Sequence, residues 1–200
     1  MSVDIVITVR GGPAAKSRCE GRFDGAALAT AMLRDMVEAA QACPEVGRGH
    51  VVTPTPEIVE GLDVILIVED APAGINAAFE RARRTVPPET MLILMPGDLP
   101  QIRAEDLSAL IAAHEPGTIT IVPSATDGGT GAIMMRADAA MDFAFGTGSF
   151  ARHMANPAAR RFDSAALGDD LDRPEDAIRA MARAGRHSRA CLARQIQDAA

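Results

Sequence analysis

Short apolar runs rich in Val, Ile and Leu alternate along this chain with longer stretches in which apolar residues recur every three or four positions. The runs have the length of buried strands, and the longer stretches have the period of amphipathic helices. The runs predict strands at residues 2–9, 50–53, 63–68, 90–95 and 118–122. The periodic stretches predict helices at residues 24–43, 71–85 and 104–114, then a helix ending near residue 156 and a last helix beginning at Pro174.

The order of these elements indicates the fold class. Strands alternate with helices, and several strands are apolar on both faces, which is typical of a mostly parallel sheet with helices on each side. After Pro123 a glycine-rich turn at 127–131 precedes a run at 132–136 that favours a strand in the opposite direction. We therefore predict a three-layer α/β fold, mostly parallel with one antiparallel excursion. No linker divides the chain, so residues 1–200 are expected to form a single domain, with 186–200 a loose or helical tail.

The composition limits the kinds of molecule that this protein is expected to bind. The 200 residues are 48% hydrophobic but contain no Trp and no Tyr, so platforms for stacking single-stranded nucleic acid are not expected. The formal net charge of −7 argues against binding to nucleic acid or to an anionic membrane, although a local basic pocket can still hold a small anion. No apolar segment is long enough to predict a membrane span.

The cysteines and histidines give no metal pattern. Cys19, Cys43 and Cys191 form no CxxC pair, and in the absence of a signal peptide we expect reduced thiols in a cytoplasmic protein. The four histidines lack metal-ligand spacing, and His50 and His187 are expected at the surface. The alanine-rich helices would permit a homodimer, which the sequence alone does not predict.

The loop after the first predicted strand is the first candidate for chemistry, because ligands of open parallel sheets bind beyond the carboxyl ends of the strands. It contains Arg10, Gly11, Lys16 and Arg18, and Lys16 is the only lysine in the chain. Glycines let a backbone approach a phosphate, and the cations neutralise its charge. The loop lacks the Walker pattern GxxxxGK[ST], and a solvated basic surface is the alternative interpretation.

Two aspartates are candidate metal ligands. Asp98 follows Gly97 directly after the predicted strand at 90–95, and Asp172 precedes Arg173 and Pro174. A carboxylate at the end of a strand is a suitable ligand for Mg²⁺, which takes hard oxygen donors and substrate phosphates. The alternatives are a turn aspartate at position 98 and a helix N-cap at position 172.

A second glycine turn predicts an anion site. Residues 147–150 would open a helix whose first amides and the Ser149 hydroxyl suit an anion. Capping of that helix by Ser149 explains the same residues equally well.

Together these loops resemble a known family. In order along the chain the motifs are VR, AAKSR, EDAPAGINAA, PGDLP, PSATDGGTGAIMMR, FGTGSFARH and DDLDRPEDA. They resemble the 2-phospho-L-lactate guanylyltransferases, a family that includes phosphoenolpyruvate and 3-phosphoglycerate guanylyltransferases within the MobA-like, GT-A-type nucleotidyltransferases. The resemblance extends from about Val3 to about Ala182.

The resemblance implies a Rossmann-like nucleotidyltransferase fold and transfer of GMP from GTP to a phosphorylated three-carbon acid with release of pyrophosphate. In this family the reaction belongs to biosynthesis of a deazaflavin redox coenzyme of the F-four-twenty type. It implies the following roles: Lys16, Asp98 and Asp172 in catalysis; Asp98 and Asp172 as ligands of Mg²⁺; Arg10, Gly11, Arg18, Gly74, Asn76 and Gly97 at the nucleotide; and Thr130, Gly146, Gly148 and Ser149 at the acceptor.

The chain departs from the family pattern at four positions. Arg10 stands where the family usually has lysine, Cys19 follows the KSR motif where leucine is usual, Gly131 replaces the asparagine of DGGTNA, and Arg173 replaces the threonine of DVDTP. Gly131 matters most, because it removes a polar side chain beside the predicted acceptor site. Two alternatives stay open: another MobA-like enzyme such as a molybdopterin guanylyl- or cytidylyltransferase, and a non-catalytic nucleotide-binding relative.

Overall fold

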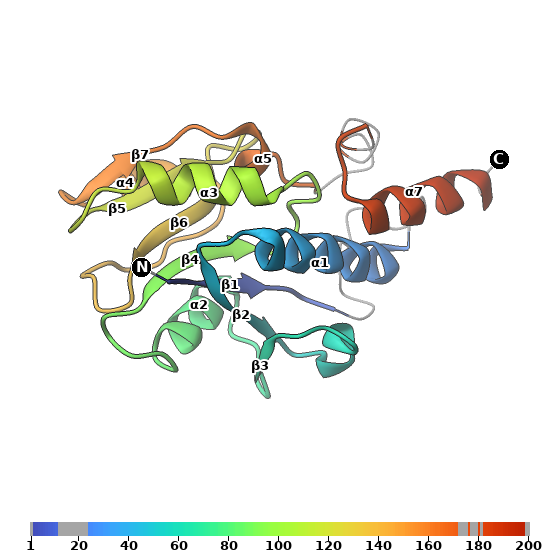
Figure 1. Cartoon of the computed structure of the whole chain (residues 1–200), viewed down its shortest axis with the longest axis horizontal. Coiled ribbons are helices and arrows are strands. Elements are labelled where there is room, and N and C mark those ends of the chain that lie inside the picture. The colour runs from blue at the N-terminus through green and yellow to red at the C-terminus, as the bar shows by residue number, and fades with distance from the viewer. Residues whose placement is uncertain (1, 12–23, 172–175, 177–179, 181, 199–200) are drawn as a thin grey trace.

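The computed structural model describes residues 2–11, 24–171, 176, 180 and 182–198, which fold into three layers around one seven-stranded sheet (Figure 1). The strand order is β3-β2-β1-β4-β6-β5-β7. The strands are β1 (Val3–Thr8), β2 (Val46–Thr53), β3 (Ile65–Val68), β4 (Met91–Pro96), β5 (Ile119–Pro123), β6 (Thr130–Arg136) and β7 (Ala159–Arg161). Within the described sheet, β6 runs antiparallel to both β4 and β5, and the other pairs are parallel. The predicted antiparallel excursion is therefore confirmed.

The helices divide between the two faces of the sheet. Against one face pack α1 (Gly25–Ala42), α3 (Ala104–Ala113), the 3₁₀ helix η2 (Pro56–Val59) and the short α5 (Ala165–Gly168). Against the other pack α2 (Ile75–Arg83) and α4 (Ser149–Met154). The central strands alternate between the two cores: Ile5 and Ile7 join the α1 side, and Val6 joins the α2 side. This double burial accounts for strands that are apolar at successive positions.

The last helix extends the α1 side of the molecule. Helix α7 (Arg186–Asp198) lies along α1, where Cys191 and Leu192 pack against Leu28 and Met32 (Figure 1). The expected tail is thus helical over residues 186–198. The predicted helix beginning at Pro174 falls largely outside the described residues. No helix in the described part of the chain has the length and apolarity needed to cross a membrane.

Several elements differ from the predictions, including the short helices η2 and α5, which were not predicted. Strand β2 begins at Val46 rather than at residue 50, because its polar first half forms an exposed parallel pair with β1. Helix α2 begins at Ile75 rather than near Pro72, because Gly74 has φ +94° and cannot continue a helix. Strand β7 was not predicted, because only one of its three residues is buried.

His50 is buried, contrary to the surface position expected for it. Only 4% of the residue is exposed, and its Nε2 lies 3.1 Å from a carboxylate oxygen of Asp4 on the neighbouring strand. The cysteines that the structure describes, Cys43 and Cys191, are buried and unpaired, as expected for reduced thiols.

Candidate active site

The connectivity of the sheet places one candidate site between β1 and β4. The chain proceeds outward from β1 to β2 and β3 and then returns to β4 on the other side of β1, so this pair is the topological switch point. Thr8 and Pro96 are register partners at the carboxyl ends of the two strands. Ligands of such sheets bind in the crevice just beyond these ends, which is where the predicted residues Arg10, Gly97 and Asp98 emerge.

Glycines let the two strand ends approach closely at this point. The Gly97 amide donates to the Thr8 carbonyl at 2.8 Å, and a Cβ on Gly97 would lie 2.9 Å from that oxygen and from Val9 Cβ. Gly11 is equally constrained, since its Cβ would lie 2.8 Å from Thr55. Gly97 and Gly11, two of the three glycines predicted at the nucleotide, therefore have a packing role. Arg10, which directly precedes Gly11, is exposed.

A returning segment of the chain reaches Asp98. The Leu171 amide donates to the Asp98 carbonyl at 3.0 Å, and the Gly168 carbonyl accepts from the Ala125 amide at 2.8 Å. Gln101 donates from its side chain to Asp169. The segment that leads to Asp172 is thus bound to the Asp98 loop. Lys16, Arg18 and Asp172 themselves lie outside the described residues.

Asp170 joins this segment to the glycine loop after β5. One of its carboxylate oxygens accepts from the Ser124 and Thr126 hydroxyls, each at 3.1 Å. Three acidic residues, Asp98, Asp169 and Asp170, therefore lie on one connected group of loops at the carboxyl edge. Sequence reasoning selected Asp98 and Asp172 and missed this function of Asp170, because the hydroxyl partners are about 45 residues away in the chain.

The predicted guanine segment is joined to the predicted acceptor loop. Gly74 is the N-cap of α2, and Asn76 lies in the first turn of that helix. Asn76 Oδ1 accepts from the Phe145 amide at 2.7 Å, and Asn76 Nδ2 donates to the Phe145 carbonyl at 3.4 Å. The Asn76 amide thereby fixes the backbone just before Gly146, and its contact with a nucleotide stays a prediction.

The four predicted acceptor residues lie together. The DGGT and FGTGSF loops are connected by hydrogen bonds from the Gly148 amide to Asp127 and from the Phe150 amide to Gly128, both to carbonyls. The Ser149 hydroxyl donates to Thr130 Oγ1 at 3.1 Å. Gly146 and Gly148 have φ values of +124° and +68°, which explains glycine at both positions.

The interpretation of residues 147–150 as a set of free helix amides is wrong. The Gly148, Ser149 and Phe150 amides donate to the carbonyls of Asp127, Gly146 and Gly128. Capping by Ser149 is also excluded, because Gly148 is the N-cap of α4 and Ser149 is fully buried.

His153 belongs to the same loop cluster, although the sequence analysis assigned it no role. The residue is 2% exposed, and its Nδ1 lies 2.8 Å from Thr130 Oγ1 while its Nε2 accepts from the Ala144 amide at 2.9 Å. Burial, reinforced by nearby Arg152, lowers the pKa of His153 from 6.5 to about 4, so the ring is neutral at neutral pH. Its place at the end of the FGTGSFARH motif was the available signal.

Glu69 is a second titratable group at the carboxyl edge. Burial raises its pKa above the usual range, and the charges of Arg81 and Arg10 oppose that rise. The charge of Arg10 thus reaches Glu69, a carboxylate in the loop after β3.

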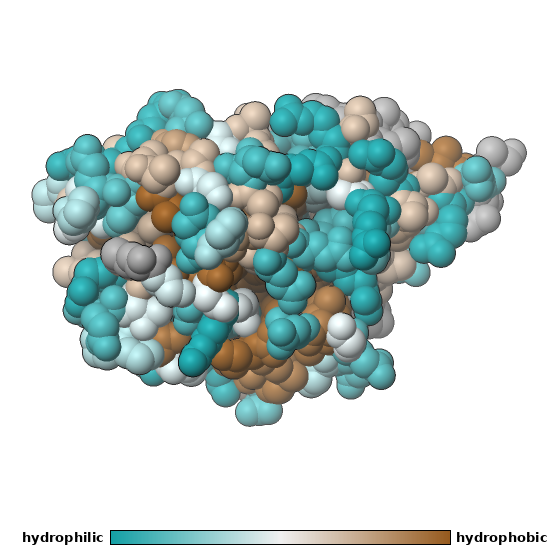
Figure 2. Space-filling model, in the orientation of Figure 1, coloured by the Kyte–Doolittle hydropathy of each residue, from teal (hydrophilic) through white to brown (hydrophobic). Residues whose placement is uncertain are grey.

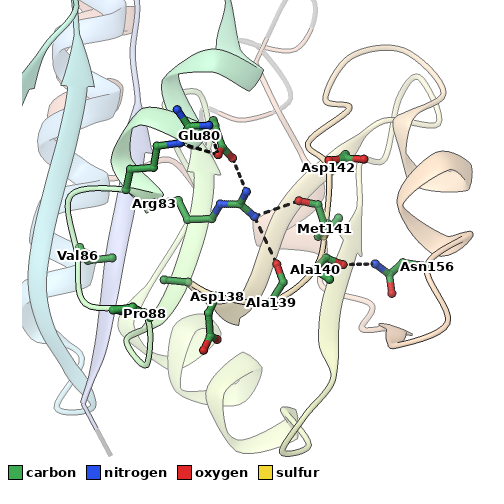
Figure 3. Close-up of a pocket in the computed structure, with 12 residues that line it drawn as sticks. Glu80, Arg83, Val86, Pro88, Asp138, Ala139, Ala140, Met141, Asp142 and Asn156 are labelled. Carbon is green, nitrogen blue, oxygen red and sulfur yellow. Dashed lines mark hydrogen bonds and ion pairs between the residues drawn. The ribbon is translucent and has the colours of Figure 1, made fainter.

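Two grooves lie away from this edge. One, of about 740 Å³, is formed by the end of α2 and the loop after β6 (Figure 3). There Arg83 points to the Met141 and Ala139 carbonyls, at 3.0 and 3.4 Å, and pairs with Glu80. The other, of about 690 Å³, lies between α1 and the edge formed by β2 and β3, and the exposed Ile65 is one of its lining residues. Figure 2 shows apolar surface, in brown, in the lower part of the molecule, where Figure 1 shows β3. Neither groove contains a predicted site residue.

A cluster of Asp35, Glu38 and His187 has ligand atoms close enough to hold a metal ion. Its groups are engaged with the protein, however. Asp35 accepts from the backbone amides of His187 and Ser188 at 2.9 and 2.8 Å, and Glu38 pairs with Arg186 and His187. The cluster therefore fastens the beginning of α7 to α1.

Residues 3–196 match the family model described as "Guanylyl transferase CofC like". The chain belongs to this family. It is therefore a nucleotidyltransferase of the guanylyltransferase type, as the sequence motifs predicted.

Two curated relatives of the CofC-like family match most of the chain. A 3-phospho-D-glycerate guanylyltransferase from Phenylobacterium zucineum is 37% identical over 191 residues, covering 88% of each chain. A phosphoenolpyruvate guanylyltransferase from Rubrobacter xylanophilus is 33% identical over 199 residues, covering 92% of this chain and 96% of the relative.

Solved structures establish the fold of this CofC-like chain. The structure of CMP:2-keto-3-deoxy-manno-octonic acid synthetase complexed with CTP superposes with a TM-score of 0.62 at 16% identity, covering 91% of this chain and 100% of the other. The 4-diphosphocytidyl-2C-methyl-D-erythritol synthase of Anaerococcus prevotii gives a TM-score of 0.60 at 11% identity, covering 90% and 94%. The predicted Rossmann-like nucleotidyltransferase fold is confirmed.

Proposed function

We propose that this enzyme transfers GMP from GTP to a phosphorylated three-carbon acid and releases pyrophosphate, in the biosynthesis of a deazaflavin coenzyme. The acceptor is 3-phosphoglycerate, phosphoenolpyruvate or 2-phospho-L-lactate. The observation that carries the proposal is the hydrogen bond between Leu171 and Asp98, which brings the segment before Asp172 to the carboxyl edge at the switch point. The names of the two relatives support the choice of acceptors.

We assign the acceptor's own phosphate as the nucleophile. One of its oxygens attacks the α-phosphorus of GTP in line. The new O–P bond forms as the bond between the α-phosphorus and the oxygen bridging to the β-phosphate breaks, and pyrophosphate leaves. A phosphate is already ionised near neutral pH, so the reaction needs no general base. This agrees with His153, whose two ring nitrogens are both engaged in hydrogen bonds.

The residues at the strand ends fit a role in positioning and charge neutralisation. Arg10, with Lys16 and Arg18 from the same loop, would neutralise the phosphates. Asn76 and Gly74 would lie beside the guanine, and Thr130, Gly146, Gly148 and Ser149 beside the acceptor.

The carboxylate donors also fit Mg²⁺. Asp98 is half-buried at a strand end, and carboxylate oxygens are the hard ligands that this ion takes. Asp98 and Asp172 would hold it, and when bound it would neutralise charge that develops on the reacting phosphates.

The test combines a substrate panel with one substitution. Wild-type protein is incubated with GTP, Mg²⁺ and each of the three acids, and pyrophosphate is measured. Asp98→Asn keeps the shape of the side chain but removes its charge, so turnover should fall at least about a hundredfold. Asp138→Asn is the matched control, because that exposed carboxylate pairs with Arg136 at the opposite edge of the sheet. Equal turnover by the two variants would contradict the proposed site.

A further inference from the structure

The Thr130 hydroxyl is the centre of a buried hydrogen-bond network. His153 Nδ1 lies 2.8 Å from Thr130 Oγ1, and the Ser149 hydroxyl donates to the same oxygen at 3.1 Å. All three residues are at most 6% exposed. They come from β6 and from both ends of α4, so the network fixes one element against the other.

The hydrogen bonds determine where the protons lie. The Ala144 amide donates to His153 Nε2 at 2.9 Å, and a backbone N–H can only donate. Nε2 therefore carries a lone pair, and Nδ1 of the neutral ring carries the proton that is donated to Thr130. The Thr130 oxygen thus accepts two hydrogen bonds, one from His153 and one from Ser149.

This arrangement leaves the Thr130 hydroxyl proton directed away from both donors. A hydroxyl has two acceptor lone pairs and one proton, and both lone pairs are used here. In the part of the chain that the structure describes, Thr130 Oγ1 has no third hydrogen-bond partner. Thr130 is the first residue of β6, which runs opposite to its neighbours and so begins at their carboxyl edge.

The ring of His153 is held in this orientation by its surroundings. Phe145 packs edge-on against it with 5.2 Å between ring centroids, and Asn76 fixes the Phe145 backbone. Burial lowers the pKa of His153 to about 4, so the neutral ring with one donor and one acceptor persists throughout the neutral range.

We propose that His153 is a positioning residue: it fixes the Thr130 hydroxyl as a hydrogen-bond donor to an anionic oxygen of the acceptor, a phosphate or carboxylate oxygen of the phosphorylated acid. The inference rests on the proposed function, because it takes Thr130 to lie at the acceptor. It assigns to His153 neither contact with the substrate nor proton transfer.

Two substitutions of His153 separate its two hydrogen bonds. In His153→Asn the side-chain amide can occupy the place of Nδ1 and donate to Thr130, but it loses the acceptor for Ala144. In His153→Gln the longer side chain can accept from Ala144 in place of Nε2, but it loses the donor to Thr130. A merely structural role in holding the loop predicts that Gln is tolerated better than Asn.

The kinetic experiment measures KM for 3-phosphoglycerate, phosphoenolpyruvate and 2-phospho-L-lactate, with GTP saturating. His153→Gln should raise the acceptor KM about tenfold, the scale of one hydrogen bond to a charged group, and leave the KM for GTP unchanged. His153→Asn should recover most of that loss. Thr130→Val should match His153→Gln, and the double variant should be no worse than Thr130→Val alone.

A matched control lies at the other edge of the sheet. His114 Nδ1 lies 2.8 Å from Thr120 Oγ1, the same pair of groups at the same distance but near the beginning of β5. His114→Gln should leave the acceptor KM unchanged. Thermal unfolding of each variant identifies any that fails to fold.

The proton positions are tested without turnover. Long-range proton–nitrogen correlation spectra of wild-type protein with ¹⁵N-labelled histidine should show His153 as the Nδ1–H tautomer near pH 7. The Nε2–H tautomer, or a His153→Gln variant at least as active as His153→Asn, would overturn the inference while leaving the proposed function intact. Wild-type protein that releases no pyrophosphate with any of the three acids would instead overturn the proposed function, and the acceptor role of Thr130 with it.

Discussion

The absence of a side chain at Gly131 lets β6 pack closely against the backbone of Leu167 and Gly168 in α5. Gly131 is a departure from the family motif, and from sequence it suggested a lost polar contact at the acceptor. The structure gives a different reason: a Cβ there would lie 2.0 Å from the Leu167 carbonyl and 3.0 Å from Gly168 Cα. Position 131 therefore faces α5, whereas Thr130 faces His153.

Gly131→Asn, which restores the usual family residue, should accordingly destabilise this protein. The new side chain must displace the backbone at Leu167, and such overpacking costs about 1–3 kcal/mol. Urea unfolding measures the loss. Gly61→Asn is the control, since nothing lies within 4 Å of a Cβ at Gly61, and asparagine tolerates its φ of +75°. An unchanged midpoint for Gly131→Asn would show that α5 moves freely.

His153 should also make stability depend on pH. Its pKa is lowered from 6.5 to about 4 on folding, so between these values the unfolded chain binds a proton that the folded chain excludes. The contribution of this residue is complete above pH 6.5 and is lost as the pH falls toward 4. Wild type should lose about 2–3 kcal/mol of unfolding free energy from this residue between pH 7 and pH 4.5. His153→Gln should lack that part of the slope, and identical slopes in urea unfolding would contradict the shift.

The sequence predicted individual site residues but not the contacts that their side chains make. The motifs identified Asp98, Thr130 and Ser149 as candidates, but their partners come from distant parts of the chain. No local sequence pattern indicates that the Ser149 hydroxyl donates to Thr130 or that the Asn76 side chain accepts from the Phe145 amide. Side-chain orientation depends on which loops meet, and that is a property of the folded sheet.

At the scale of elements, prediction succeeded where apolar runs were long and buried. Strands β1, β4 and β5 and helices α1 and α3 were predicted to within about two residues at each end. Strand β7 was missed because it has three residues and is largely exposed, and the first half of β2 because it is polar and glycine-rich. Pattern methods detect burial, and these segments are ordered by pairing with a neighbouring strand instead.

Helix α7 provides a prediction at this scale. Buried Asp35 on α1 accepts from two amides at the beginning of α7, so Asp35→Ala should cost about 1–2 kcal/mol and loosen the helix. Amide hydrogen exchange should show lost protection in α7 with little change in β4. Asp63→Ala is the control, because Asp63 is exposed. Full protection of α7 in Asp35→Ala would show that apolar packing alone holds it.

At the scale of the whole molecule, the sheet order concentrates the chemistry at one edge. The switch point between β1 and β4, the antiparallel start of β6 and the end of β5 all face the same side, so residues from position 10 to position 171 meet there. The sequence predicted the three layers and the edge but not the strand order, which long-range pairing decides. The net charge of −7 is compatible with anionic substrates because Arg10 emerges at this edge and can supply local positive charge.

Pyrophosphate release from GTP and Mg²⁺ should be measured for wild type and for Asp98→Asn, with and without each phospho-acid. We expect release by wild type that depends on at least one acid, with a GMP adduct of that acid detected by mass spectrometry. We expect Asp98→Asn to lose at least about a hundredfold in rate while Asp138→Asn retains the wild-type rate. Release that is independent of every acid, or that is unchanged in Asp98→Asn, would contradict the account.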